Sequence, residues 1–300
     1  MLKMIENPVP WPNGARVAVC LSFDIDSDSL LQIGHASKAE HMVAAQSWLR
    51  YDRIAVRRLV DMFNYYKIRQ TFFFPAWCME HYPELVDCIQ RSGHEIAYHG
   101  YLHEHPNEQS YEDEKYWLQK SIAVFEKMTG SRPRGARAPL YNYSGHSTEL
   151  LIKEGFLYDA SLMGDDVPYL LKCDAGELLE LPSHWAMDDW PQYVHAMELD
   201  YVMPIRSPAE AMQVFMAEFE SMWRHQGMLI GVWHPFASGR LARCEAVANM
   251  IEKMIDRGQV WFASMEEIAQ HIQACRKNGT YQPRIEDIPQ YDASFVPTHK

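Results

Sequence analysis

Two aspartates separated by one residue follow the first apolar run of the chain. Asp24 and Asp26 come at the end of the run 17–23, VAVCLSF. Two carboxylates leaving a buried strand repel each other unless a cation or a proton lies between them. An Asx turn that closes the strand, with Asp28 adding solvation, would use the same residues. From this segment alone, a cation site and a simple turn are equally supported.

A pair of histidines forms the second cluster. His99 and His103 stand in the sequence HGYLH, directly after the short run 95–98. Three intervening residues let one turn of chain aim both imidazoles at one ion. A polar loop that contains several histidines is the other interpretation, because a motif match is only a hypothesis. Together with Asp26, the histidines form a two-histidine, one-carboxylate set with open positions for water, the pattern of a catalytic metal site.

Three further positions could complete a hydrolytic site around that metal. Asp24 would be free to take a proton from water whose pKa the ion lowers. Arg137, at the end of another short strand, can pair with Asp24 and hold it ionised, although a surface arginine before a turn proline would look the same. His234 follows the apolar run 228–233 and suits a general acid that protonates a leaving nitrogen. A packed or capping histidine is the ordinary alternative.

An aromatic segment, HWAMDDW, contains Trp185 and Trp190 on either side of two acids. This composition predicts a pocket wall in which one acid hydrogen-bonds His234 and raises its pKa. Aromatic and methionine-rich runs also form ordinary core, so both interpretations stand.

The elements that must position these residues alternate along the chain. Short apolar runs are separated by amphipathic stretches of helical length, which indicates βα units and a parallel sheet. About seven such units approach the count of a barrel, where loops at the carboxyl ends of the strands carry the chemistry. The predicted strands are 17–23, 71–74, 95–98, 135–137, 179–181, 228–233 and 260–262, and the predicted helices are 52–66, 84–91, 112–128, 148–154, 209–225, 245–255 and 266–275.

Length and composition are those of an ordinary globular protein. The 300 residues are 47% hydrophobic and 23% charged, which excludes a disordered or fibrous chain. We predict one domain over residues 1–300 with its core at about 16–275. Segments 27–50 and 184–208 interrupt the βα pattern and are predicted insertions. The proline-rich tail, 278–300, is expected on the surface or against a neighbouring subunit.

The charge balance limits the partners. There are 28 Lys and Arg against 40 Asp and Glu, a net charge of −12 that repels nucleic-acid phosphates and anionic lipid. We therefore expect no nucleic-acid and no membrane partner. The N-terminal segment lacks the apolar stretch of a signal peptide, which predicts a cytoplasmic location. The proline-rich tail suggests subunit contacts in a homo-oligomer, either a dimer or a tetramer.

The ordered motifs resemble those of the NodB-homology polysaccharide deacetylases, carbohydrate esterase family four. The correspondence covers roughly residues 16–273. Residues 23–26 are similar to the first motif, in which one aspartate is the base and the next binds metal, although here an isoleucine separates the two. HGYLH matches the second motif, and Arg137-x-Pro139 matches the third. Asp189-Trp190 resembles the fourth motif, and His234 resembles the fifth.

This resemblance implies a distorted (β/α)7 barrel that hydrolyses a non-peptide C–N bond. It implies a divalent metal ion, for which Zn²⁺ is the first expectation and Co²⁺, Mn²⁺ or Ni²⁺ would also suit the ligands. A backbone N–H near Leu140 would stabilise the oxyanion. The implied roles are base for Asp24, metal ligand for Asp26, His99 and His103, acid for His234, orientation for Arg137 and Asp189, and substrate contact for Pro139, Leu140, Tyr141, Trp185, Trp190 and Trp233.

The motifs leave the substrate open. The chain looks most like an intracellular subgroup that includes peptidoglycan-deacetylase-like proteins, cyclic imide hydrolases and relatives of the metal-independent allantoinases. An N-acetylated sugar is the first expectation. A small cyclic imide or ureide is the close alternative, because the insertions 27–50 and 184–208 should narrow the site. A non-haem iron enzyme with the same ligand triad and a non-catalytic sugar-binding module are the remote alternatives.

Overall fold

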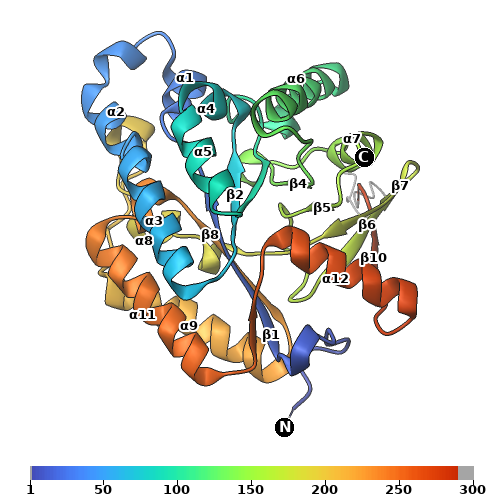
Figure 1. The fold of residues 1–300 in the computed structure, drawn as a ribbon. Coiled ribbons are helices and arrows are strands. Elements are labelled where there is room, and N and C mark those ends of the chain that lie inside the picture. The colour runs from blue at the N-terminus through green and yellow to red at the C-terminus, as the bar shows by residue number, and fades with distance from the viewer. Residues whose placement is uncertain (1, 290–300) are drawn as a thin grey trace, which may run out of the picture.

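The computed structural model describes residues 2–289, which fold around one curved sheet (Figure 1). The strand order is β10-β6-β7-β5-β4-β3-β2-β1-β8, and β9 also pairs with β1. Neighbouring strands run parallel except for β6 and β7, which are antiparallel. The strands are β1 Val17–Asp24, β2 Thr71–Phe74, β3 Glu95–Tyr98, β4 Gly135–Ala136, β5 Tyr158–Asp159, β6 Tyr169–Cys173, β7 Gly176–Glu180, β8 Met228–Trp233, β9 Val260–Phe262 and β10 Ile285–Asp287.

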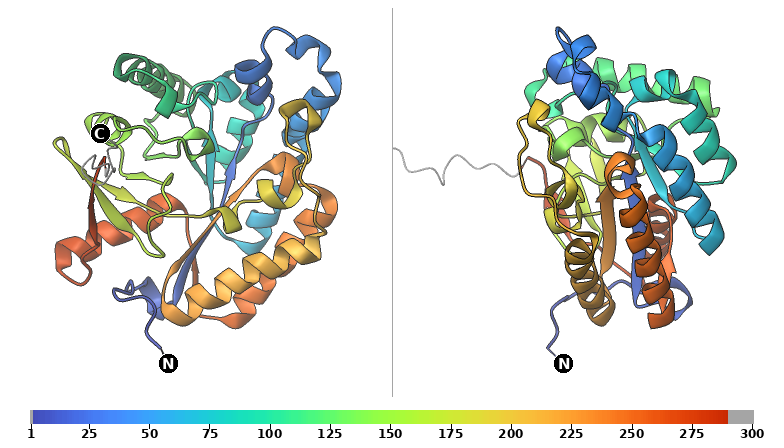
Figure 2. Two further views of the ribbon diagram at one scale, coloured as in Figure 1. Left: turned by 180° about the vertical axis from the view of Figure 1, so that it is seen from behind. Right: turned by 90° about the vertical axis from the view of Figure 1, so that its left-hand side faces the viewer.

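Helices pack on the outside of this sheet, as the two turned views show (Figure 2). They connect successive parallel strands, as βα units require. The helices are α1 Ser29–His35, α2 Val43–Leu49, α3 Asp52–Tyr66, α4 Ala76–His81, α5 Pro83–Arg91, α6 Tyr111–Thr129, α7 Ser147–Lys153, α8 Trp190–Tyr193, α9 Pro208–His225, α10 Pro235–Ser238, α11 Leu241–Arg257 and α12 Met265–Asn278. None of the helices in the described part combines the length and the apolar character needed to cross a bilayer.

Strand β1 pairs with three other strands, and all eight of its residues are buried. It pairs with β8 along one edge. On the other edge β9 pairs with its amino half and β2 with its carboxyl half. The carboxyl end of β1, where Asp24 lies, is therefore fixed between β2 and β8.

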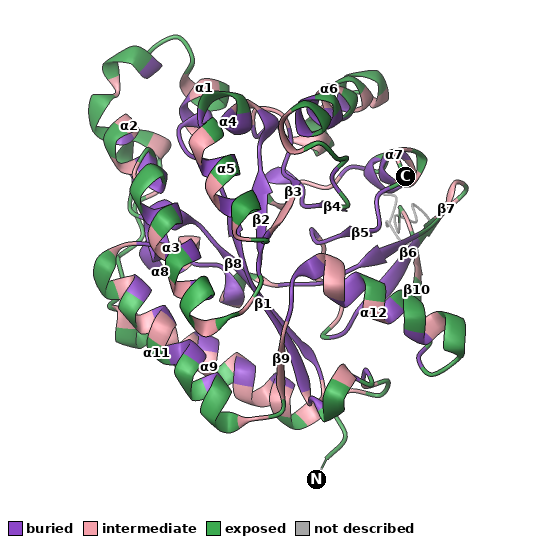
Figure 3. Cartoon of the chain, in the orientation of Figure 1, coloured by how far each residue is buried: buried purple, intermediate pink, exposed green. Residues whose placement is uncertain are grey.

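The alternation of side chains along the strands decides which residues reach the inside of the barrel. In β1, Val19 and Phe23 belong to the cluster between the sheet and its helices, whereas Ala18 and Cys20 belong to the inner cluster. Since side chains alternate with a period of two, Asp24 shares the inner face. Figure 3 shows the buried strands at the centre of the fold, surrounded by helices whose outer faces are exposed.

The fold class predicted from the sequence is confirmed. Each of the seven predicted strands and seven predicted helices matches an observed element, with ends that differ by a few residues at most. The pattern missed β5, β6 and β10. The barrel is distorted because β7 and β8 are not directly paired; one parallel bridge between Asp188 and Val232 joins the segment after β7 to β8.

The segments outside the βα pattern have their own structure. Segment 27–50 forms α1 and α2, and 184–208 contains α8 and short 3₁₀ turns. The predicted tail contains β10, which pairs with β6 at the end of the sheet, and Ile285 and Asp287 stay exposed, so residues 285–287 lie on the surface as expected. The rest of the predicted tail, 290–300, lies outside the described residues.

Candidate active site

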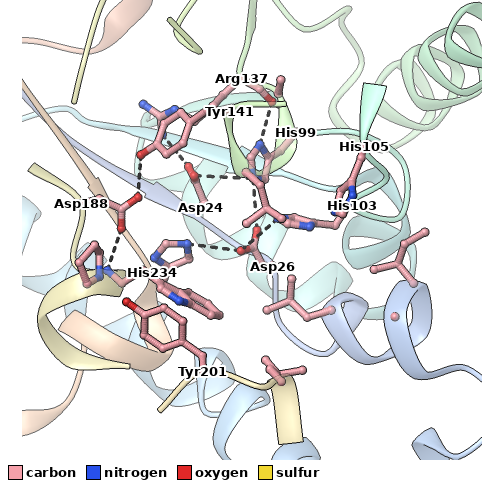
Figure 4. Close-up of a pocket in the computed structure, with 18 of the residues that line it drawn as sticks. Asp24, Asp26, His99, His103, His105, Arg137, Tyr141, Asp188, Tyr201 and His234 are labelled. Carbon is pink, nitrogen blue, oxygen red and sulfur yellow. Dashed lines mark hydrogen bonds and ion pairs between the residues drawn. The ribbon is translucent and has the colours of Figure 1, made fainter. Parts of the chain in front are cut away.

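A pocket of about 540 Å³ lies at the carboxyl ends of the strands (Figure 4). The residues that line it come from loops after β1, β3, β4 and β8 and from the two segments that interrupt the βα pattern. Most of the residues singled out in the sequence meet here: Asp24, Asp26, His99, His103, Arg137, Leu140, Tyr141, Trp185, Trp190 and His234.

Asp26 lies at the centre of the pocket floor. Its Oδ1 is 3.4 Å from Nε2 of His99, and its Oδ2 is 3.5 Å from Nε2 of His103 and 3.4 Å from Nε2 of His234. These separations exceed ordinary hydrogen bonds, and among the described residues the buried Oδ1 has no hydrogen-bond partner. Burial opposes ionisation, but the three imidazoles outweigh it and hold the pKa of Asp26 below its usual range. The floor therefore presents a buried anion with an unused acceptor.

The backbone after β1 holds Asp26 in place. Ser27 adopts a positive φ of 44°, and both its N–H and its hydroxyl donate to Oδ2 of Asp52, at 3.2 and 2.8 Å. The Ser29 hydroxyl donates to the carbonyl of Asp26. Asp52 is fully buried at the start of α3 and was not singled out in the sequence analysis. Its carboxylate fixes the turn that presents Asp26.

The loop after β3 orients the two histidines. Nδ1 of His99 lies 2.8 Å from the carbonyl oxygen of Arg137, so Nε2 is directed at Asp26. Both carboxylate oxygens of Glu104 accept backbone N–H groups of the same loop, and His103 has a φ of 61°. Gly100 has a φ of 79°, and a Cβ there would approach Pro139 to 3.1 Å, so only glycine suits this position.

Asp26, His99 and His103 have the chemistry and spacing of a cation site. Their ligand atoms all lie within 4.8 Å of one another. Two atoms that are each about 2.1 Å from a tetrahedral ion lie about 3.4 Å apart, close to the N–O separations found here. Burial lowers the pKa of His103 to about 4, so its ring is neutral and has a free lone pair at neutral pH. The residues present therefore fit a divalent metal ion.

Asp24 has a different environment from Asp26. Its Oδ1 accepts a hydrogen bond of 2.6 Å from Nη1 of Arg137, and both side chains are buried. The guanidinium also donates to the Ser22 hydroxyl and the Ala160 carbonyl, which fixes its plane. The other oxygen of Asp24 lies 3.6 Å from Nε2 of His99 and faces the pocket. This arrangement leaves one carboxylate oxygen of Asp24 available to accept a proton.

His234 approaches the same floor from β8. Its Nδ1 lies 2.7 Å from Oδ1 of Asp189, and its backbone N–H donates to Oδ2 of the same carboxylate. The Ser238 hydroxyl also donates to Asp189. Burial disfavours the charged imidazole, but Asp189 and Asp26 outweigh it and raise the pKa of His234 well above its usual value. His234 is thus held as a proton donor with Nε2 directed at the floor.

The upper walls of the pocket are largely apolar and aromatic. The Trp185 ring packs edge-on against Tyr141 at 4.7 Å, and the Trp190 ring against His234 at 5.5 Å. The Tyr141 hydroxyl donates to Asp188, whose pKa burial raises to about 7. Wall residues without a role in the sequence analysis are Leu30, Ile33, Gly34, His35, His105, Ala138, Asp188, Pro191, Leu199 and Tyr201.

Three residues singled out in the sequence do not line this pocket. Trp233 is fully buried and packs against Phe23 and Phe215, so its predicted substrate contact is wrong. Pro139 lies behind Gly100 rather than on the wall, which corrects the same prediction for that residue. Asp189 is fully buried behind His234 and can act only through it.

Comparisons with known proteins identify several proteins to which this chain is similar. Residues 45–158 match the family model described as "Polysaccharide deacetylase". A peptidoglycan deacetylase of Helicobacter pylori is 29% identical over 229 residues, which is 68% of this chain and 77% of the relative. A solved structure from Mycobacterium smegmatis, classed with the polysaccharide deacetylases, is 36% identical with a TM-score of 0.89, and the match covers 95% of this chain and 98% of that one.

The fold and the comparisons together define the class of protein. The chain is a deacetylase-like hydrolase, of the kind that acts on amide C–N bonds. It belongs to the polysaccharide deacetylase family, the NodB-homology family with the (β/α)7 barrel fold.

Proposed function

We propose that the chain is a divalent-metal-dependent hydrolase that removes the acetyl group from an N-acetylated sugar. The observation that carries this proposal is the buried Oδ1 of Asp26, which has no hydrogen-bond partner among residues 2–289 and faces an imidazole nitrogen at 3.4 Å. A carboxylate in that position is costly unless a cation shares it. Family membership and the similarity to a peptidoglycan deacetylase support the acetylated sugar as first choice.

The roles of the residues follow from their positions. A divalent ion held by Asp26, His99 and His103 would polarise the amide carbonyl and lower the pKa of water. Asp24, held by Arg137, takes a proton from the attacking water, and the hydroxide oxygen forms the new bond to the acetyl carbon. The metal identity is open, with Zn²⁺ first and Co²⁺, Mn²⁺ or Ni²⁺ as the other candidates.

Breaking the C–N bond requires a proton on the departing nitrogen. His234 donates that proton from Nε2, while Asp189 holds the opposite side of its ring. The products are acetate and a free amino sugar. Leu140 and Tyr141 have consecutive positive φ values of 50° and 57° at the pocket. Such conformations are costly for non-glycine residues and cluster at functional sites. We assign the Leu140 N–H to stabilising the oxyanion.

A second candidate function is ring opening of a small cyclic imide or ureide. The shape and composition of the pocket favour it. Leu30, Ile33 and Leu199 come from the two segments that interrupt the βα pattern and form apolar walls. A volume of about 540 Å³ suits a small molecule better than a long glycan in an open groove. The reacting group, an amide carbonyl, is the same in both cases.

One experiment separates these functions. The protein is treated with a chelator, reloaded with Zn²⁺ or Co²⁺, and assayed with N-acetylglucosamine oligomers, succinimide, dihydrouracil and allantoin. Acetate release from the oligomers supports the first proposal, and ring opening without acetate supports the second. Activity that is indifferent to chelation would contradict both. Iron-dependent oxygen consumption would instead indicate the iron enzyme, and no turnover of any kind, with sugar binding intact, would indicate a binding module.

A further inference from the structure

A second hollow lies on the outer side of the loop that carries His234, and it is lined by residues of α2, α8 and α11. Its volume is about 420 Å³, and Trp48, Tyr193 and Phe236 form part of its walls. Phe236 lies in α10, which begins directly after His234. The hollow is therefore separated from the active site by α8 and α10, and the catalytic proposal does not use it.

Three arginines line this hollow. The guanidinium of Arg240 lies 3.7 Å from the centre of the Tyr51 ring, and that of Arg243 lies 4.2 Å from the centre of the Tyr193 ring. Arg243 donates to the carbonyls of Ala237 and Tyr193, which limits its motion. Arg206 is exposed at the edge. The two inner guanidinium groups are thus held in fixed positions by rings and carbonyls.

These arginines have no carboxylate partners within 4 Å among residues 2–289, unlike most arginines elsewhere in this acidic chain. Glu210 and Asp189 are close enough to affect Arg206 and Arg243 respectively. Both carboxylates already accept other hydrogen bonds, Glu210 from Ser207 and Asp189 from His234. These arginines are therefore balanced only at a distance, and no carboxylate of residues 2–289 is in direct contact with their guanidinium groups.

Capping of carbonyls at the end of α10 explains only part of this arrangement. Arg240 uses Nε for the carbonyl of Phe236, and both of its Nη groups lack a hydrogen-bond partner in the described chain. Burial lowers the pKa of Arg243, and the neighbouring Arg240 charge lowers it further. Gathering like charges in a half-buried hollow is unfavourable without a counter-ion. The unused N–H donors indicate what that counter-ion must offer, namely several acceptor oxygens.

We propose that this hollow binds a small organic phosphate. The phosphate oxygens accept hydrogen bonds from Arg240, Arg243 and Arg206, because guanidinium groups match phosphate oxygens in pairs. A planar apolar part of the same molecule rests against Trp48 and Phe236. A phosphate is favoured over a carboxylate because three arginines line the hollow and a phosphate monoester carries nearly two negative charges. The volume lies within the range of small-molecule sites.

The test is calorimetric titration of the full-length protein with phenyl phosphate, which combines a planar ring with a phosphate monoester. Ala242 lines the hollow and is exposed, so Ala242→Glu adds a carboxylate without removing any arginine contact. Ala242→Gln is the matched neutral control of nearly equal size. We expect Ala242→Glu to weaken binding at least about tenfold and Ala242→Gln to change it less than about twofold.

A second pair of variants tests the arginines directly. The double change Arg240→Gln and Arg243→Gln should abolish the titration. Its control, Arg132→Gln with Arg134→Gln, removes the same charge from half-exposed positions far from the hollow and should leave binding unchanged. If the first double variant fails to fold, the Ala242 pair still decides the question.

Other outcomes would overturn the proposal. The site is refuted by a lack of saturable binding up to about 10 mM phenyl phosphate, or by equal binding to Ala242→Glu and Ala242→Gln. Benzoate that binds as tightly as phenyl phosphate would overturn the preference for phosphate. Inorganic phosphate that binds as tightly would overturn the role of the aromatic wall.

Discussion

The two ends of the same strands carry polar clusters of opposite kinds. Glu95 begins β3 and His99 directly follows it, so the period of two places both side chains on the inner face. At the amino end, Glu95 accepts hydrogen bonds from the Thr71 and Tyr158 hydroxyls at 2.7 and 2.8 Å and from the backbone of Glu266 at 2.9 Å. This carboxylate is fully provided with donors.

At the carboxyl ends of the strands, the described residues supply too few hydrogen-bond donors for the central carboxylate. Asp26 faces imidazole nitrogens at distances too long for strong hydrogen bonds, and its Oδ1 has none in the described residues. Buried polar groups with complete hydrogen bonding stabilise a fold, whereas unsatisfied ones need an explanation such as a ligand or ion. The comparison shows that a charged group inside the fold does not by itself identify a functional site. A charged group that lacks hydrogen-bond partners does.

The largest effect is expected from removing the carboxylate that lacks partners. Asp26→Ala, and separately His99→Ala, should lose stoichiometric divalent metal and lower hydrolytic activity by at least about 10³-fold. Metal content is measured after dialysis, together with activity. Glu95→Gln, at the amino end of β3, is the control variant and should keep its metal. Full metal content and activity in Asp26→Ala or His99→Ala would refute the ligand assignment.

Asp24→Asn should distinguish the general base from the metal ligands at the carboxyl ends of the strands. We expect kcat to fall by about 10²- to 10⁴-fold, the usual contribution of a general base, while metal content stays stoichiometric. Loss of the metal together with activity would exchange the roles of Asp24 and Asp26. An unchanged rate would favour a non-catalytic protein.

Glu95, at the amino end of β3, should affect the free energy of unfolding and its dependence on pH. Burial, opposed in part by hydrogen bonds from Glu266, Thr71 and Tyr158, raises the pKa of Glu95 from 4.5 to about 7. Between these values the folded state keeps a proton that the unfolded chain releases, so this contribution to the free energy of unfolding is complete below pH 4.5 and is lost as pH rises through 7.

Glu95→Gln should remove that dependence. Relative to the natural chain, the variant should gain about 3 kcal/mol between about pH 5 and pH 8, since one pKa unit corresponds to about 1.4 kcal/mol. Urea unfolding at the two pH values measures the change. A constant difference between variant and natural chain across this range would show that the donors keep Glu95 ionised in the folded protein.

The smallest effect is expected from a change at the rim of the active-site pocket. Trp185 is half-exposed and contacts Tyr141 rather than the floor. Trp185→Ala should raise KM by about tenfold with little change in kcat, because uniform substrate binding is lost and the reacting groups are untouched. Metal content should not change. A fall in kcat equal to that of Asp24→Asn would show that the rim takes part in the chemistry.

The sequence predicted the residues of the floor because they directly follow strands. A strand end fixes both the position of the next residue and the face on which it lies. The same rule explains why the predicted substrate contact of Trp233 is wrong. In β8, Ile230 and Val232 face the inner cluster, so Trp233 faces the helices and His234 returns to the inside. Counting this parity would have corrected the prediction from the sequence alone.

The walls were harder to predict. Leu30, Asp188 and Tyr201 come from segments without a regular apolar period, and only the tertiary structure brings them to one pocket. β4 and β5 have two residues each, too few for a period to appear. Asp52 was hidden because a single aspartate at the start of a helix is ordinary.

The pairing of β1 also determines when the sheet can be completed during synthesis of the chain. Its neighbours β8 and β9 lie in residues 228–262, near the other end of the chain. Contacts between such distant segments are slow to form, and domains emerge from the ribosome amino end first. Until β8 and β9 arrive, a nascent chain holds a largely apolar strand with an unpaired edge, a template for association with other chains. We expect newly made protein to depend on a chaperone over this interval.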